Sequence, residues 1–390
     1  MSPRSSDTQH FYSRFRSFIS EPCDGSPRGR TPLPELSWAD RQDIWDLMAK
    51  KESGMYRRQN ADQVLTRHPA LQPRMRAILL DWLIEVCEVY RLHRETFYLA
   101  VDFIDRFLSV APAIPKNRLQ LIGVTCLFIG AKIEEIYPPK LQEFAYVTDG
   151  ACTEEEILQM ELMILKGLNW GLSPMTPNAW MRLYMQICHG SKKSCDEAFF
   201  LPAYSGLPFS RAMQLLDLCL LDMSSLEFSY SVLAASALYH SECEAVALQV
   251  SGETLPGPQE SPAILTLFSS PPGYSWQQIS KCDSWMSAFA FALRERSPLQ
   301  PKSFHGISPE DAHHLQPHVV DLELLARAQE RLAAIATGGL RESPDPSTTL
   351  PPGHPSTALP RWSKVPGPWE AGWCALEHSS VHCGPQCGVV

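Results

Sequence analysis

Two short stretches contain the residue types that phosphoryl-transfer enzymes use. Residues 93–95 (His-Arg-Glu) and 102–104 (Asp-Phe-Ile) are similar to the catalytic and metal-binding motifs of protein kinases. The first has Glu in place of Asp and no downstream Asn, and the second lacks its Gly. The two lie too close together, and no glycine-rich phosphate loop accompanies them. We therefore expect ordinary helix surfaces. The sequence also lacks a P-loop, a Gly-x-Ser-x-Gly elbow and a His-Glu-x-x-His motif, so it indicates no other enzyme class.

Two groups of residues could bind a metal by type alone. His314 and His318 are one helical turn apart with Asp311 nearby, and residues 382–387 of the tail contain one His and two Cys. Neither group offers four ligands at the spacing of a zinc site. We interpret them as a solvated helix and a loose tail, and expect neither a metal nor a cofactor.

Three charged residues interrupt segments that are otherwise apolar. Lys132 stands in one such segment, Glu161 in another, and Arg76 in a third. A buried arginine needs a carboxylate partner, because an unpaired buried charge costs several kcal/mol. On residue type alone, Lys132 and Glu161 are two solvated charges.

The segment 74–91 must position Arg76, and its residues predict a helix. No Gly or Pro interrupts it, and Pro73 stands where the first helical turn tolerates proline. One narrow wedge is acidic and nearly all the rest is apolar, which is typical of the central helix of a helical domain. The acidic wedge contains Asp81, Glu85 and Glu88, and apolar residues recur on the far side at Met75, Ile78, Leu79, Trp82 and Val86.

Helical periodicity continues along most of the chain. Five helices are expected from Pro73 to Leu168, the last one opened by a capping box at Thr153 and Glu156. A shorter helix capped by Ser37 should precede them, and one capped by Ser308 should follow. A second helical set is expected over 176–188, 209–223, 228–243 and 275–295. Without a strand pattern, this order predicts an all-α fold.

Composition and charge limit the function classes. The 390 residues have room for two core-bearing modules, and the net charge of -9 argues against generic nucleic-acid binding. No stretch reaches the about 20 apolar residues of a membrane span, and the amino terminus lacks the apolar run of a secretory signal. The 12 cysteines lack paired spacing, so we expect reduced thiols packed in the core of a cytosolic or nuclear protein.

Long runs of the sequence resemble the cell-cycle cyclins, and within them the cyclin E group. The resemblance begins at residues 75–79 (Met-Arg-Ala-Ile-Leu), the hydrophobic-patch signature of cyclins. It continues through 88–90, 92–100 (Leu-His-Arg-Glu-Thr-Phe-Tyr-Leu-Ala), 119–123, 134–140 (Glu-Glu-Ile-Tyr-Pro-Pro-Lys) and 144–152, and more patchily through 216–219, 226–228 and 233–240.

The resemblance implies two consecutive five-helix cyclin boxes and a division of the chain into five parts. These are a disordered lead (1–36), the N-terminal helix with the first box (37–172), the second box (173–300), a C-terminal helix (301–337) and a disordered tail (338–390). Residues 253–273, rich in Pro and Ser, separate two segments that are contiguous in cyclin E. We expect a disordered insertion there, which we interpret as a splice variant or a gene-model artefact.

The resemblance also implies a regulatory, non-catalytic subunit that binds and activates cyclin-dependent kinase 2 at the G1/S transition. In this family Lys132 and Glu161 would hydrogen-bond the kinase near its αC helix, with Leu165 and Ile44 among the apolar contacts. Arg76 and Asp105 would form the internal salt bridge that the buried arginine requires. The implied location is the nucleus, with the cytoplasm and the centrosome as further places.

A second implied site is a docking groove on the helix 74–91. In cyclins this face is exposed and takes the Arg-x-Leu motif of substrates and Kip-type inhibitors. Its expected residues are Met75, Ile78, Leu79, Trp82, Glu85, Leu119 and Gln120, with Glu85 meeting the arginine of the motif. The alternative for any such apolar face is ordinary core packing.

Regulation by phosphorylation is less well marked. Thr31 and Ser343 precede proline and are candidate kinase targets. Cyclin E carries a Leu-Thr-Pro-Pro-x-Ser degron, but residues 348–352 (Thr-Thr-Leu-Pro-Pro) place no threonine directly before the prolines. The sequence therefore does not decide whether a ubiquitin ligase is a partner of this chain.

A rival function exists for the same fold. General transcription factors that bridge promoter DNA and polymerase also use it. The acidic charge and the groove at Met75 speak against that alternative.

Overall fold

The computed structural model describes residues 41–55, 61–190, 204, 206–249, 276–296, 302–309 and 311–337. Within these ranges the regular structure is helical, and an isolated antiparallel bridge joins His93 to Leu315. The all-α prediction is therefore confirmed. Five cysteines in the described ranges are free and buried, which fits the expected packed thiols: Cys87, Cys126, Cys152, Cys219 and Cys282. Burial raises the pKa of the Cys282 thiol to about 12.

The first repeat consists of the five helices that the sequence predicts between Pro73 and Leu168. Helix α5 is buried on nearly all its faces, and α6 packs along it and contacts α4 and α8. Close packing depends on Gly123 of α6, where a Cβ would lie 2.5 Å from the side chain of Leu79 on α4. The helices are α4 (Pro73–Tyr90), α5 (Arg94–Val110), α6 (Leu119–Glu134), α7 (Leu141–Tyr146) and α8 (Glu154–Gly167), with a 3-10 turn η1 (Lys116–Arg118) before α6.

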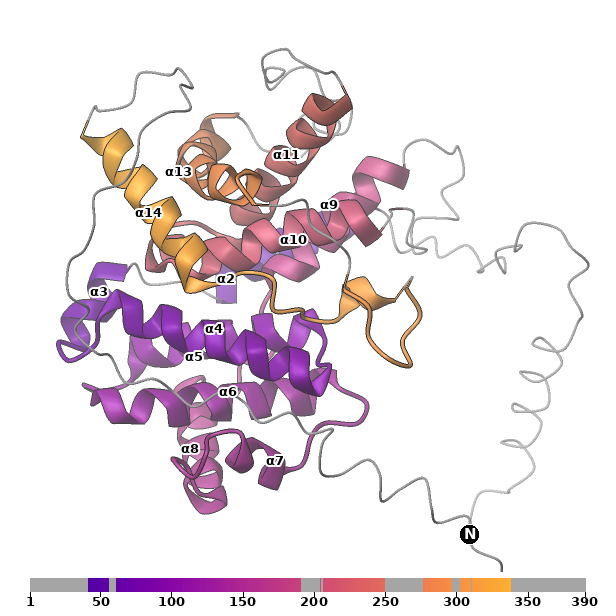
Figure 1. Cartoon of the computed structure of the whole chain (residues 1–390). Helices are drawn as coiled ribbons and strands as arrows, with labels where there is room; N and C mark the ends of the chain where they lie inside the picture. The colour runs from indigo at the N-terminus through magenta and orange to yellow at the C-terminus, as the bar shows by residue number, and fades with distance from the viewer. Residues whose placement is uncertain are drawn as a thin grey trace, which may run out of the picture.

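The second repeat lies against the first, with α10 next to α4 (Figure 1). Its core contains the fully buried rings of Trp180, Tyr184 and Phe209. The described helices are α9 (Pro177–Gly190), α10 (Gly206–Leu221), α11 (Tyr230–Gln249) and α13 (Trp276–Arg294), with a 3-10 turn η3 (Met223–Glu227) after α10.

Helix α2 (Arg41–Met55) packs against the second repeat through Trp45 and Glu52. Its Trp45 ring lies 5.8 Å from the ring of Trp180 and 5.3 Å from that of Tyr184. Glu52 accepts a hydrogen bond of 3.0 Å from the backbone N–H of Ser231. The reason is that Trp45 finds its apolar neighbours on α9. The short α3 (Ala61–Arg67) was not expected from the sequence.

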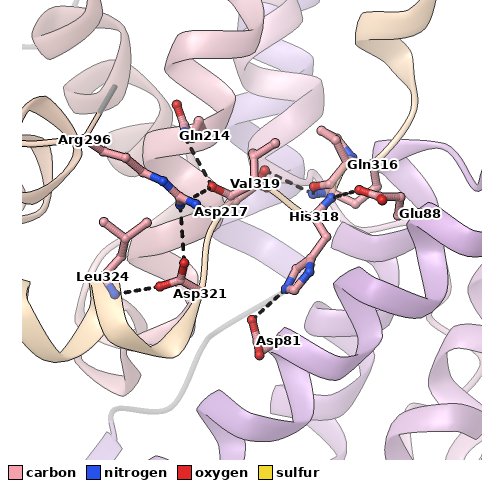
Figure 2. A network of polar contacts seen from close by, with 11 residues as sticks. Asp81, Glu88, Gln214, Asp217, Arg296, Gln316, His318, Val319, Asp321 and Leu324 are labelled. Atoms are coloured by element: carbon pink, nitrogen blue, oxygen red, sulfur yellow. Dashed lines mark hydrogen bonds and ion pairs between the residues drawn. The ribbon is translucent and has the colours of Figure 1, made fainter. Parts of the chain in front are cut away.

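The segment after the second repeat also differs from the prediction. Residues 312–314 form a 3-10 turn, η4 (Ala312–His314), residues 315–321 are extended, and α14 (Leu322–Ala336) begins later than the expected start near Pro309. Asp321 caps α14 by accepting a hydrogen bond of 2.8 Å from the N–H of Leu324, so the helix starts there. We call residues 315–321 the strap, because they run between α4 and α10 (Figures 1 and 2).

Several predictions fall outside the described residues. These are the lead 1–36, the insertion 253–273, the tail 338–390, the tail group of His and Cys, and the candidate phosphorylation sites Thr31 and Ser343.

The described part of the chain has neither a candidate membrane span nor a candidate metal cluster. It contains no helix long and apolar enough to cross a membrane. It also contains no group of three or more His, Cys, Asp or Glu side chains that could hold a metal ion.

Candidate protein-binding sites

The first candidate site joins the end of α6 to the middle of α8. Lys132 stands in the last turn of α6, where the helix dipole favours a cation, and Glu161 stands on α8. Their side chains form an ion pair, and the Lys132 ammonium also lies 4.1 Å from the centre of the Phe128 ring. Lys132 is 39% exposed and Glu161 13%, so this charged pair is at the surface. The structure thus brings together the two residues that the sequence singled out.

Helix α8 holds its part of this site in place through its amino-terminal cap. The predicted capping box is present: the Thr153 hydroxyl accepts a hydrogen bond of 3.2 Å from the Glu156 N–H, and the Thr153 N–H donates one of 3.1 Å to the Glu156 carboxylate. Ile157, Met160 and Ile164 then bury one face of the helix in the core. The opposite face is left to solvent.

That opposite face exposes large apolar side chains among its polar ones, which the sequence did not indicate. Leu162 is 55% exposed and Met163 51%, although both are large hydrophobic side chains. Exposed apolar groups gathered around a polar pair are typical of protein-binding surfaces. We call this set of residues the α6–α8 patch: Lys132, Ile133, Leu158, Glu161 and Leu162. The sequence of α8 could have indicated this exposure, because it has more apolar residues than one buried helix face can hold.

Two of the expected kinase-contact residues are placed differently. Leu165 is only 7% exposed and belongs mainly to the core, so it supports the α6–α8 patch from below. Ile44 is half-buried beside Trp45, and α2 instead exposes Leu47.

The second candidate site is the groove on α4 and α6, which the structure divides into floor and rim. Leu79 and Trp82 are buried, so the expectation of an exposed face is wrong for these two, whereas Leu119 was expected in the floor and is buried there. The reason is that Leu79 packs directly against Gly123 at the close approach of α4 to α6. Met75, Ile78, Glu85 and Gln120 are half-buried and reach the surface. A small apolar rim with one carboxylate therefore remains.

The acidic wedge of α4 is covered on one side by the strap. His318 Nε2 lies 2.9 Å from an Asp81 carboxylate oxygen, and the His318 backbone N–H donates to Glu88, as Figure 2 shows. The expectation of a solvated helix for His314 and His318 is thus wrong, since both rings are half-buried. Burial, and then the neighbouring His313, lowers the pKa of His314 to about 4.

Buried polar contacts hold the two repeats together beneath these sites. The expected salt bridge is present: Arg76 Nε and Nη2 donate to the two Asp105 carboxylate oxygens at 2.7 and 2.8 Å. Arg76 Nη1 also donates to the Leu220 carbonyl of α10 at 2.7 Å, a contact across the repeats that the sequence did not indicate.

A second buried cluster at the same junction surrounds Asp217 of α10. Its carboxylate accepts hydrogen bonds from Arg94 at 2.9 Å, from the Tyr98 hydroxyl at 2.7 Å and from Gln316 of the strap at 3.0 Å. These fully buried hydrogen bonds therefore join α5 of the first repeat and the strap to α10 of the second repeat.

Two helical repeats joined in this way match the profiles of a known family. The cyclin N-terminal domain matches residues 43–173, and the cyclin C-terminal domain matches residues 175–318. The chain therefore belongs to the cyclin family, which makes it a regulatory protein of the cell cycle.

Among the relatives, the G1/S-specific cyclins E are similar over most of the chain. The Gallus gallus G1/S-specific cyclin-E1 is 47% identical over 85% of this chain and 74% of its own, and the Danio rerio cyclin-E1 is 45% identical over 89% and 77%. The resemblance to cyclin E is thus confirmed. A solved viral cyclin from herpesvirus saimiri is 20% identical, covering 65% of this chain and 97% of its own, with a TM-score of 0.45.

Proposed function

We propose that this cyclin binds and activates cyclin-dependent kinase 2 at the G1/S transition. The α6–α8 patch is the observation that supports this proposal most strongly. It combines a surface ion pair, Lys132 with Glu161, with large exposed apolar side chains such as Leu162. An apolar helix of the kinase would bury those side chains, and the ion pair would supply hydrogen bonds at fixed positions.

Activation through this patch would be a shift between kinase conformations. A cyclin that binds the active conformation better than the inactive one raises the active population, and needs no catalytic residue of its own. The described helices of the first repeat form one packed core, so the patch presents a nearly rigid template.

The test mixes the purified full chain with the monomeric kinase and a histone-type substrate. Phosphorylation should rise well above that of the kinase alone, and a well-folded chain that leaves the kinase inactive contradicts the proposal. A useful comparison is Ile335→Ala on α14, which removes an equally exposed apolar group remote in sequence from the α6–α8 patch. This variant should activate as well as the parent chain.

We further propose that the groove recruits Arg-x-Leu segments of substrates and Kip-type inhibitors. Met75 and Ile78 offer apolar contact to the leucine, and Glu85 offers a carboxylate to the arginine. Burying one leucine contributes roughly 2 kcal/mol, so this site would raise the local substrate concentration rather than bind tightly.

The groove is best tested through its half-buried rim. Met75→Ala with Ile78→Ala should slow phosphorylation of Arg-x-Leu substrates and leave activity on a short peptide without the motif unchanged. Trp82 is not changed, because truncating a buried tryptophan lowers the free energy of unfolding by about 3–5 kcal/mol. A loss of docking in such a variant could then result from unfolding. Ile335→Ala on α14 is the matched control, since it shortens an exposed apolar side chain elsewhere. Equal rates on both substrates for the double variant contradict docking.

The place of action proposed for this chain is the nucleus. Imaging of the tagged full chain in dividing cells would test it, and exclusion from the nucleus throughout the cycle would contradict it.

A further inference from the structure

The strap places one histidine on the acidic wedge of the groove helix. His318 Nε2 lies 2.9 Å from Asp81 Oδ1, and the His318 N–H donates to Glu88 (Figure 2). Asp81 and Glu85 are four residues apart on α4 and therefore neighbours on one face of the helix. The histidine thus lies beside the carboxylate that the proposed docking function assigns to an incoming cation.

The strap is held at residues on both sides of His318. The Gln316 N–H donates to the Leu92 carbonyl at 2.9 Å, and the Gln316 side chain donates to Asp217 at 3.0 Å. The Val319 carbonyl accepts from Gln214 at 3.3 Å and from Arg296 at 3.2 Å. Because hydrogen bonds hold Gln316 and Val319 in place, the His318 imidazole remains beside α4. Its protonation should therefore change the charge next to Asp81 without moving the strap.

The charges around His318 favour its protonated form. Burial lowers the pKa of His318, but the hydrogen bond and the negative charge of Asp81, together with the charges of Glu85 and Glu88, outweigh burial and raise it above its usual value. Lys302, from the segment before η4, pairs with Glu88 and so counters one of these carboxylates. Asp321 and Arg296 pair with each other further along the strap.

We propose that His318 sets how strongly the acidic end of the groove attracts the arginine of a docking segment. This inference rests on the proposed docking function of the groove. With the imidazole protonated, its positive charge compensates Asp81 and weakens the field at Glu85. With the imidazole neutral, Asp81 is uncompensated, and both carboxylates act on the incoming cation.

The expected size of the effect follows from screened Coulomb interactions. One unit charge a few Å away, near a protein surface and at physiological salt, changes cation affinity about threefold to tenfold. Docking affinity should therefore rise by this factor from about pH 6 to about pH 9, an interval that spans a histidine pKa raised above its usual value of about 6.5. By linkage, a bound docking segment must lower the pKa of His318 by the corresponding amount.

The experiment measures binding of a fluorescent Arg-x-Leu peptide to the full chain at about pH 6 and about pH 9, below and above the raised pKa of His318. The parent chain should bind about threefold to tenfold more tightly at the higher pH. His318→Gln keeps a side-chain N–H for Asp81 without a titratable proton, so its affinity should be the same at both pH values. A peptide with citrulline in place of arginine should also lose the pH dependence.

The matched control is His240→Gln. His240 of α11 also pairs with an aspartate, Asp283 of α13, at 3.1 Å, but it lies in the second repeat away from the groove. This variant should keep the pH dependence of the parent chain.

The two proposals fail in different ways. Peptide binding that is independent of pH in the parent chain, or unchanged pH dependence in His318→Gln, overturns the role of His318 alone. Absence of peptide binding at both pH values overturns docking at the groove and this inference with it. Histidine NMR gives a separate check, because the His318 resonance of the parent chain must titrate at lower pH when the peptide is bound.

Discussion

The first repeat contains two ion pairs of the same chemical type in opposite surroundings. Arg76 and Asp105 are 4% and 6% exposed, and the arginine donates to both carboxylate oxygens and to a backbone carbonyl of the other repeat. Lys132 and Glu161 are 39% and 13% exposed and lie beside apolar side chains that face solvent. The difference teaches that surroundings, rather than residue type, separate a pair that stabilises the fold from a pair available to a partner.

Physical chemistry gives the two pairs separate experimental signatures. Breaking a buried pair leaves an uncompensated charge in a low dielectric, so it should change the free energy of unfolding. Breaking an exposed pair removes an interaction that water largely screens, so it should change binding with little change in stability.

The largest expected effect comes from Arg76→Met. Losing the guanidinium leaves the buried Asp105 carboxylate without its arginine, and the free energy of unfolding should fall by about 3–5 kcal/mol in urea denaturation. The double variant Arg76→Met with Asp105→Leu removes both charges and should recover much of the loss. A single variant as stable as the parent chain would show that the pair does not hold the repeat together.

The next effect should come from Leu162→Asp in the α6–α8 patch. A charge placed at the centre of a desolvated interface should weaken association with the kinase by at least about thirtyfold. Calorimetric titration with the monomeric kinase measures this change. Ile335→Asp on α14 is the control, because it alters an equally exposed apolar residue on a different element. Equal weakening by both variants would remove the special role of the patch.

A smaller effect is expected from Lys132→Ala. The variant loses the ion pair with Glu161 at the edge of the apolar surface, and kinase association should weaken about tenfold while helical circular dichroism is unchanged. The control is Lys281→Ala in the second repeat, since Lys281 also pairs with a carboxylate, Glu227, and lies 5.6 Å from the centre of a phenylalanine ring. Loss of helicity in Lys132→Ala would make its ion pair a structural one.

The smallest effect should be that of Lys281→Ala on stability. Its pair with Glu227 is highly exposed, so the free energy of unfolding should change by less than about 0.5 kcal/mol. The same denaturation experiment as for Arg76→Met measures it. A change as large as that of the buried pair would contradict the contrast between the two environments.

Much of the first repeat could be predicted from sequence because its signals are local. The capping box at Thr153 and Glu156, the apolar period of α4 and the prolines after α6 depend on neighbours within a few residues. The partner of Arg76 could be required on physical grounds, because a buried arginine needs a carboxylate. The identity of that partner came only from the cyclin resemblance.

The features that sequence reasoning missed depend on contacts far apart in the chain. The bond from Arg76 to Leu220 and that from His318 to Asp81 each join residues more than a hundred positions apart, and no local pattern announces such a pairing. The packing of α2 on α9 has the same origin, since Trp45 is apolar enough for either repeat. Exposure of Leu162 was missed because hydrophobicity alone does not say which face of α8 the core occupies.

The strap has a consequence for the order in which this polypeptide assembles during synthesis. Its bonds to Leu92, Asp81 and Glu88 require residues 315–321, which leave the ribosome only after every helix of both repeats. Domains usually complete their packing in the order in which they are made. Helix α4 is made early in synthesis. Its acidic side can be covered only after residues 315–321, almost the last described segment, have been translated. Synthesis of residues 315–321, rather than completion of the first repeat, therefore marks the earliest point at which that helix can reach its final surroundings.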